Sequence, residues 1–173
     1  MNNKVIPYSM VPGLKEFVKK IDFQPAQNDC ITRGESKYIT GGWFEEYIYF
    51  MIRQLFIPSD VATGVVIRRN QNANNDVNEL DVVFTYKNRL FAIECKTGVG
   101  KPKRYHQTVY KACALHEALL GMRSNAYIFS LNDDPKDILK VTARNMNITF
   151  CDCSYALRPT KMINLFQNPS LYI

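Results

Sequence analysis

The sequence lacks several features that would place it in a familiar class of proteins. No apolar run reaches the length of a membrane-spanning helix, and the first ten residues lack the charged start and apolar block of a secretory signal. There is also no internal repeat and no glycine-rich loop of the nucleotide-binding type. We therefore expect a cytoplasmic protein with one main domain.

Histidine and cysteine are too few, or too irregularly placed, for the usual metal or disulfide frameworks. The two histidines, His106 and His116, are not at ligand spacing on one helix face. The five cysteines are irregularly spaced, which favours reduced thiols, and the close pair Cys151 and Cys153 has no second pair to complete a zinc site. The remaining composition is ordinary for a globular protein, with a formal charge of +6 that is compatible with a polyanionic partner.

Hydrophobic periodicity divides the chain into alternating helices and strands. Residues 1–37 are predicted to be an N-terminal arm or connector with one short helix at 11–20, and residues 38–173 the main domain. A strong helix begins after Gly41-Gly42 and is stopped by Pro58. The further predicted elements are strand 61–69, a hairpin over 79–98, helix 103–120, strand 125–130, helix 135–145, strand 147–151 and helix 159–167. Three adjacent strands followed by crossover helices predict an α/β fold, with a mixed sheet flanked by helices.

The predicted hairpin, ELDVVFTYKNRLFAIECKTG, is apolar but carries four charges on its two strands. A turn at positions 87–88 predicts that Asp81 lies directly opposite Glu94 and that Glu79 lies opposite Lys96. Because side chains alternate along a strand, all four then project from one face, and the apolar side chains project from the other. In this register Glu79 is expected to be a partner of Lys96.

Two carboxylates that face each other repel, so a positive group is expected between them. Lys96 is one candidate, and a divalent cation such as Mg²⁺ or Mn²⁺ is the other, since hard cations take oxygen ligands. Asp81, Glu94 and the backbone carbonyl of Cys95 would then be ligands, and Lys96 would orient the attacking water or take its proton. The alternative is a structural ion cluster on a solvated sheet face, which is common on antiparallel strands.

The spacing Asp-x12-Glu-x-Lys, from Asp81 to the run Glu94-Cys95-Lys96, resembles the motif of the PD-(D/E)XK nuclease superfamily. Three blocks are also similar, in order, to the nuclease domain of the DUF1887 family: GGWFEEYIYFMIRQL, NELDVVFTYKNRLFAIECKTG and LHEALLGMRSNAYIFS. Its Card1/Can2-like members join this domain to a CARF domain, which senses cyclic oligoadenylates in CRISPR immunity. The resemblance spans about residues 38–130.

This resemblance implies a restriction-endonuclease-like core of order αβββαβ and metal-dependent hydrolysis of DNA or RNA, in defence against foreign nucleic acid. By analogy with related nucleases it also implies a homodimer. Two departures are clear: the sequence has no room for a CARF domain, so regulation by a ligand is not carried over, and Leu80 stands where the superfamily name has a proline. The alternative is a catalytically inactive nucleic-acid-binding or regulatory module that retains the fold.

Two glutamates compete for a place beside the proposed metal. On a helical wheel Glu45 borders the apolar stripe of its helix, whereas Glu46 points to the opposite side. The family motif also places its acid directly after the pair Trp43-Phe44. We therefore expect Glu45 to be a further metal ligand, directly or through a water, the alternative being a charge that merely borders the core.

Basic and aromatic residues follow the motif in the run KTGVGKPKRYH. Lys101, Lys103 and Arg104 suit contact with a phosphate backbone, and Tyr105 suits stacking on a base. Gln107 comes next, early in the following helix, where related nucleases often carry a glutamine that faces the site. These five residues are the predicted nucleic-acid contacts. Ordinary solvated loop charge is the alternative for the basic residues, and a surface glutamine is the alternative for Gln107.

Overall fold

The chain forms two compact units, Met1–Trp43 and Phe44–Ile173. The computed structural model describes residues 5–26, 29–68, 77–98, 102–118, 124–131 and 137–168. None of the helices in these ranges is both long enough and apolar enough to cross a membrane.

The N-terminal unit has a two-stranded antiparallel sheet and short helices. Its elements are β1 (Val5–Pro7), the 3-10 turn η1 (Tyr8–Met10), α1 (Leu14–Lys20), β2 (Cys30–Thr32), α2 (Arg33–Lys37) and the π-helical turn η2 (Tyr38–Gly42). β1 pairs with β2, and Val18, Ile31 and Ile39 form a small buried core. The short helix predicted at 11–20 is thus confirmed over a narrower range, whereas β2 and α2 lie in a stretch for which no periodicity was found.

α2 begins with a capping box. The Glu35 backbone N–H donates to the Thr32 hydroxyl at 3.2 Å, and the Thr32 N–H donates to the Glu35 carboxylate at 2.7 Å. This reciprocal pair satisfies two N–H groups that the start of a helix leaves without intrahelical partners.

The larger unit confirms the predicted α/β fold, with a helix, three strands and then alternating helices and strands. Its elements are α3 (Trp43–Leu55), β3 (Asp60–Arg68), β4 (Val77–Tyr86), β5 (Arg89–Lys96), α4 (Pro102–Ala118), β6 (Ser124–Ser130), α5 (Asp137–Asn145), β7 (Ile148–Cys151), α6 (Cys153–Ala156) and α7 (Pro159–Gln167). The single turn α6 was not predicted; Asp152 caps it by accepting a 3.0 Å hydrogen bond from the Ser154 N–H.

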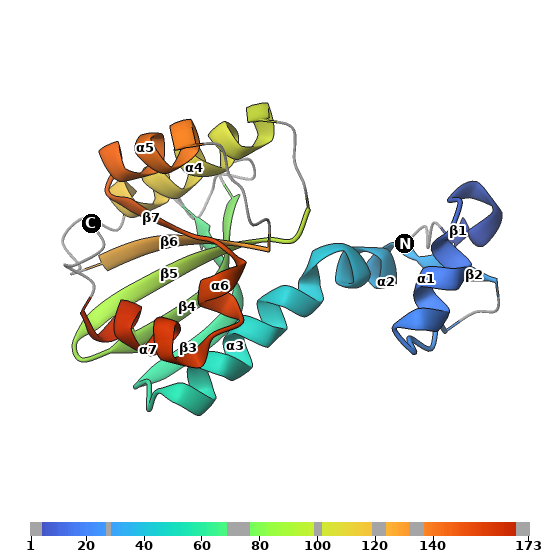
Figure 1. Ribbon diagram of the computed structural model, residues 1–173, viewed down its shortest axis with the longest axis horizontal. Coiled ribbons are helices and arrows are strands. Elements are labelled where there is room, and N and C mark those ends of the chain that lie inside the picture. Colours follow the sequence, from blue (N-terminus) through green and yellow to red (C-terminus); the bar gives the residue numbers. More distant parts are fainter. Residues whose placement is uncertain are drawn as a thin grey trace. The chain divides into compact units, whose positions relative to one another are not determined.

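The five strands lie side by side in chain order, β3-β4-β5-β6-β7. The first three are antiparallel to one another, and the pairs β5-β6 and β6-β7 are parallel, so the sheet is mixed. α3, α6 and α7 cover one face of this sheet, and α4 and α5 cover the other (Figure 1). The charged face of β5 is the one toward α4.

The core beneath α3 is largely aromatic. Phe44, Ile48 and Ile52 on α3 are completely buried against the strands. Phe166 from α7 contacts the rings of Phe84, Phe91 and Tyr127 with centroids 5.1, 5.5 and 5.1 Å away. The opposite core is smaller; its members are Val109, Ala112, Ala126, Ile128, Ala143 and Ile148. Because both faces of the sheet are packed, the position of β5 relative to α3 and α4 is fixed.

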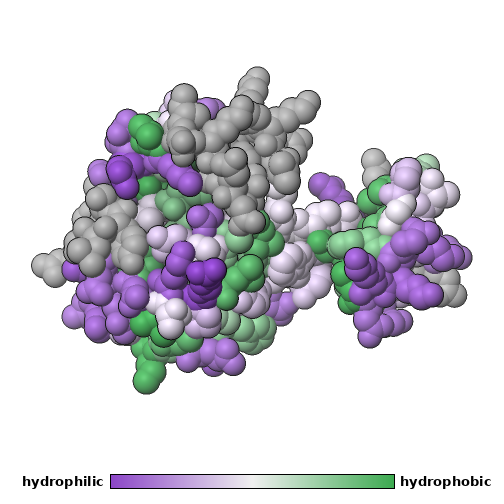
Figure 2. Space-filling view, viewed as in Figure 1, coloured by the Kyte–Doolittle hydropathy of each residue, from purple (hydrophilic) through white to green (hydrophobic). Residues whose placement is uncertain are grey.

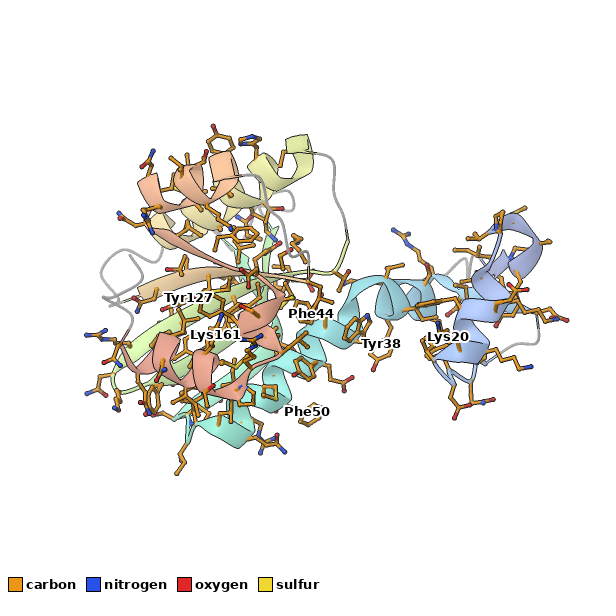
Figure 3. All side chains as sticks on the ribbon, in the orientation of Figure 1. Lys20, Tyr38, Phe44, Phe50, Tyr127 and Lys161 are labelled. Carbon is orange, nitrogen blue, oxygen red and sulfur yellow. The ribbon has the colours of Figure 1, made fainter. Side chains whose placement is uncertain are left out.

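The outer surface of this unit mixes polar and apolar residues. Figure 2 shows hydrophilic and apolar residues interspersed on the face that it displays. Phe50 lies on the outer side of α3, away from the sheet, and is 53% exposed (Figure 3).

Candidate active site

The hairpin of β4 and β5 folds in the register predicted from its turn. Lys87 and Asn88 form a two-residue turn, and both have positive φ, 50° and 58°, as the common hairpin turn requires. Tyr86 pairs with Arg89 beside the turn, and successive pairs follow from there. This register places Asp81 and Glu94 at the far end of the hairpin.

β4 and β5 separate at that end. Among the described residues the last pair of the ladder is Val82 with Ile93. Beyond it, Oδ2 of Asp81 accepts a 2.7 Å hydrogen bond from the N–H of Cys95, while β4 stays paired with β3. The predicted register is thus confirmed as far as Val82 with Ile93. The ladder ends one pair before Asp81 and Glu94, and there the Asp81 carboxylate, in place of its backbone, bonds to β5.

β3 is the other neighbour of β4, and it carries a glycine at the level where β4 and β5 separate. Gly64 lies across from Asp81 and has a φ of 61°, a conformation that favours glycine. Oε1 of Glu79 lies 3.5 Å from the place that a Cβ on Gly64 would occupy, so the Glu79 side chain lies against β3. The ladder between β4 and β5 does not extend to Glu79 and Lys96, and the role of Glu79 as a partner of Lys96 stays a prediction.

Glu94 is the buried centre of the site. Its side chain is only 7% exposed, and two lysines contact it. Nζ of Lys96 donates to Oε1 at 2.7 Å. Nζ of Lys111 lies 3.0 Å from Oε2 and 3.2 Å from Oε1, so it contacts both carboxylate oxygens. The carboxylate is thus neutralised by a strand lysine and by a helix lysine.

Lys111 is the site residue that the sequence analysis missed. It lies on α4, and the buried residues Val109 and Ala112 fix that helix against the sheet. A sequence signal was available, because Lys111 follows Gln107 by four residues and so lies one turn further along the same helix face.

The electrostatics of the site disfavour a second carboxylate charge. Burial raises the pKa of Asp81, and the charge of Glu94 raises it further. The hydrogen bond from Cys95 and the charges of Lys96 and Lys111 act in the opposite direction without cancelling the effect. Asp81 is therefore a carboxylate whose negative charge is incompletely compensated.

Lys96 keeps its charge in this environment. Burial lowers its pKa, but the charge of Glu94, the hydrogen bond to it and the charge of Asp81 outweigh burial, and the net pKa is raised. Burial also raises the pKa of the Cys95 thiol well above its usual range. Lys96 is thus an ammonium and Cys95 a neutral thiol, so only the backbone of Cys95 offers a hard oxygen ligand.

We call the point where β4 and β5 separate the fork. The fork, with Asp81, Glu94 and Lys96, lies in a segment that matches a known family. Residues 32–158 match the family of Card1-like endonuclease domains. The chain belongs to this family. The resemblance to Card1/Can2-like and PD-(D/E)XK nucleases is thereby confirmed. No protein of curated function matches the sequence.

Several solved structures share the fold of this Card1-like domain, among them Can2 and protein VC1899. Can2 from Sulfobacillus thermosulfidooxidans, in complex with cyclic tetra-adenylate, is 24% identical with a TM-score of 0.64, over 89% of this chain and 44% of that one. Protein VC1899 from Vibrio cholerae is 19% identical with a TM-score of 0.66, over 90% of this chain and 41% of that one. The chain therefore spans less than half the length of either protein.

The two competing glutamates of this Card1-like domain differ in burial. Glu45 is half-buried and Glu46 is exposed. The charge of Glu45 is among those that raise the pKa of the Cys95 thiol, which places its carboxylate near β5. In the part of the chain that is described, however, no three side chains of the His, Cys, Asp and Glu types lie close enough to hold a metal ion together. The role of Glu45 as a ligand stays a prediction.

The predicted nucleic-acid contacts fall mostly outside what the structure describes. Lys101 lies outside the described residues, and of Lys103, Arg104 and Tyr105 only the backbone, in the first turn of α4, lies within them. Gln107 is described, and its side chain is exposed on α4.

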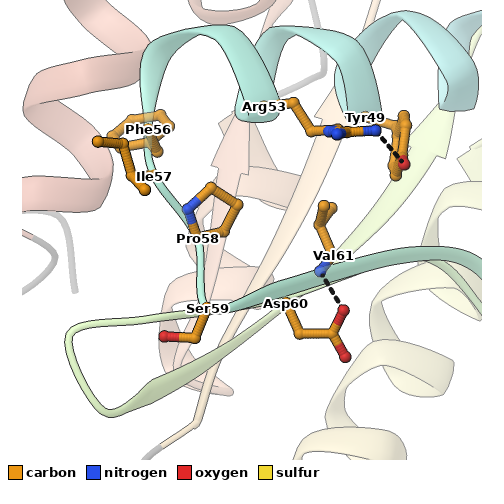
Figure 4. A pocket seen from close by; sticks show the side chains of 8 residues that line it. All are labelled: Tyr49, Arg53, Phe56, Ile57, Pro58, Ser59, Asp60 and Val61. Atoms are coloured by element: carbon orange, nitrogen blue, oxygen red, sulfur yellow. Dashed lines mark hydrogen bonds between the residues drawn. The ribbon is translucent and has the colours of Figure 1, made fainter.

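An open pocket of about 480 Å³ lies elsewhere, where α3 ends and β3 begins (Figure 4). Its lining includes Tyr49 and Arg53, whose guanidinium donates to the Tyr49 hydroxyl at 3.1 Å. None of the predicted site residues lines it. This pocket is therefore separate from the predicted site residues.

Proposed function

We propose that this Card1-like domain is a metal-dependent nuclease that hydrolyses phosphodiester bonds of DNA or RNA, with Asp81 and Glu94 as ligands of Mg²⁺ or Mn²⁺. The observation that carries the proposal is the convergence of two acids and a lysine where β4 leaves β5. Where two strands separate, backbone N–H and C=O groups that a continuous ladder would hydrogen-bond become available to other partners.

The residues at the fork fit a hard divalent cation. Mg²⁺ and Mn²⁺ prefer carboxylate and carbonyl oxygens, which Asp81, Glu94 and the backbone of Cys95 supply. The charge of Glu94 raises the pKa of Asp81, and a cation between the two would relieve this repulsion. Glu45 would complete the site directly or through a water. When bound, the cation polarises the phosphate and activates water.

Lys96 is the proposed catalytic lysine. Its ammonium lies 2.7 Å from Glu94 and so beside the proposed ligands. As an ammonium it donates hydrogen bonds to the attacking water and stabilises the negative charge that builds on the phosphoryl oxygens. Because an ammonium has no free lone pair, we assign the proton of that water to a phosphate oxygen or to solvent, and Lys96 orients the water.

The proposed partner is nucleic acid, in a cytoplasmic and defence-related setting. The basic net charge favours a polyanion. Lys101, Lys103, Arg104, Tyr105 and Gln107 are the proposed contacts, since they follow the acidic motif in the chain. A homodimer, in which two sites act on one substrate, completes the proposal.

A cleavage assay on single- and double-stranded DNA and RNA tests the function. Each substrate is incubated with Mg²⁺, Mn²⁺ or EDTA, and wild type is compared with Asp81→Asn and Lys96→Met. Glu45→Gln and Glu46→Gln form a matched pair, because the two neighbours differ in burial. We expect metal-dependent cutting that the first three substitutions reduce and Glu46→Gln leaves intact.

Two results would contradict the proposed function. Nucleic-acid binding without cutting, and without metal binding at Asp81, would identify a catalytically inactive module that keeps the fold. Cutting that survives both Asp81→Asn and Lys96→Met would place the active site elsewhere.

A further inference from the structure

We propose that Lys111 is an internal counter-ion that the divalent cation displaces from Glu94 when the site loads. In this view Lys111 is a positioning residue, which holds the Glu94 carboxylate in place until the metal arrives. The inference rests on the proposed metal-dependent function, and it assigns a role to a residue of α4 that lies outside the Asp-x12-Glu-x-Lys motif.

The contacts of Lys111 carry the first step. Its ammonium lies 3.0 Å from Oε2 and 3.2 Å from Oε1 of Glu94, so it straddles the carboxylate. This is the position from which a cation contacts both oxygens of a carboxylate. A metal bound to Glu94 in this way and the ammonium of Lys111 therefore compete for the same place.

Lys96 is the lysine that lies on the same strand as Glu94. It contacts only Oε1 and lies on the same strand face as Glu94, two residues away. The backbone at Lys96 is held by pairing with Ser130 on the neighbouring strand β6. Its position beside Glu94 is thus built into the sheet.

Lys111 reaches Glu94 from a separate element, α4, through a flexible stem. Its side chain is 35% exposed and that of Lys96 is 33% exposed, so the two lysines differ in the element that carries them and not in exposure. Lys111 can withdraw from Glu94 without any change in the sheet. The residue one turn before it on α4, Gln107, is exposed, so a withdrawn ammonium joins a polar surface.

The charges of the cluster give the reason for the exchange. Asp81, Glu94 and the proposed ligand Glu45 carry three negative charges. Lys96 and Lys111 carry two positive charges and leave the cluster without full compensation. A divalent cation added to the intact cluster leaves an excess of one positive charge, and the withdrawal of Lys111 removes that excess. The released ammonium then becomes available to an anionic phosphate oxygen of the substrate.

Metal binding by the full chain tests this exchange directly. The Mn²⁺ dissociation constant is measured by titration calorimetry for wild type, Lys111→Met, Lys111→Arg, Lys140→Met and Asp81→Asn. Lys140 is an exposed lysine on α5, so its substitution changes the net charge equally without touching Glu94. We expect Lys111→Met to bind Mn²⁺ about tenfold more tightly, within the usual range of coupling between contacting groups. Lys111→Arg and Lys140→Met should stay close to wild type, and Asp81→Asn should lose the site.

A second measurement needs no substitution. Amine-directed labelling of wild type, read by mass spectrometry, should modify Lys111 slowly without metal and faster with Mn²⁺. Lys140 is the internal reference and should not respond to the metal. If Lys111→Met does not fold, Lys111→Gln and this labelling carry the test.

The possible failures are distinguishable. If wild type binds no Mn²⁺, or binds it equally after Asp81→Asn, the proposed metal centre is wrong and the exchange falls with it. If wild type binds Mn²⁺ through Asp81 but Lys111→Met binds it no more tightly, the metal centre stands and the exchange is overturned. Unchanged labelling of Lys111 on metal addition overturns it as well.

Discussion

Substitution of Glu94 by glutamine should destabilise the metal-free protein, because two lysines depend on this one carboxylate. Glutamine keeps the shape of the side chain but presents an NH₂ group where one oxygen stood. Lys96 and Lys111 would then share a single weaker acceptor, and the two ammonium groups would repel each other without a negative charge between them.

The contacts of Glu94 set the expected magnitude. Hydrogen bonds to charged groups contribute about 1.5–3 kcal/mol each, and Glu94 accepts three of them. The lysine side chains are 33% and 35% exposed, so water recovers much of this energy. We therefore expect a loss of about 2 kcal/mol, which at about 2–4 °C per kcal/mol lowers Tm by about 4–8 °C.

Thermal and urea unfolding at pH 7 in EDTA measure the effect, followed by circular dichroism. Glu46→Gln is the control, because it makes the same chemical change at an exposed glutamate and should stay within about 0.5 kcal/mol of wild type. Equal stability of Glu94→Gln and wild type would mean that the lysines do not depend on the carboxylate, and would refute this account of the site.

Three further substitutions have defined expectations in the metal-free protein. Asp81→Asn should raise stability at pH 7, because the folded-state pKa of Asp81 is raised. In the wild type the raised pKa of Asp81 contributes stability at low pH, and this contribution is lost as pH rises through the folded-state pKa. The stability gained by Asp81→Asn, measured by urea unfolding, should therefore be largest at pH 7 and vanish toward about pH 4. Tyr127→Phe should stabilise by about 1 kcal/mol, since the buried hydroxyl has no hydrogen-bond partner among the described residues; a lower Tm would reveal a partner. Gly64→Ala should destabilise by about 1–2 kcal/mol because φ is 61°, and an unchanged unfolding midpoint would argue against the bend in β3.

Local chemistry explains why much of the fold was predictable. α3 begins at Trp43, directly after the glycine pair, and its last hydrogen-bonded turn ends before Pro58, as the sequence predicted. The register of the β4–β5 hairpin follows from a turn of only two residues. α2 was missed although Thr32 and Glu35 have the spacing of a capping box, a signal that is readable without any periodicity.

The details of the site depended on contacts that no local pattern encodes. Alternation along a strand predicts which side chains share a face. It contains no signal for the residue at which two paired strands separate. That separation depends on a side-chain acceptor, Asp81, and on the unusual φ of Gly64. Lys111 reaches Glu94 only because α4 packs on that face of the sheet, and this packing involves residues distant in sequence.

The position of Asp81 at the fork explains why this apolar hairpin carries a carboxylate there. Where β4 leaves β5, the N–H of Cys95 loses a backbone acceptor, and an unpaired buried N–H would cost about 1–3 kcal/mol. Asp81 supplies the acceptor through one oxygen, which leaves the other oxygen for a cation. The same carboxylate therefore maintains the opening of the strands and offers a ligand in it. Asparagine retains the first of these roles and weakens the second, whereas alanine removes both, so only the asparagine variant separates the metal chemistry of Asp81 from its part in the fold.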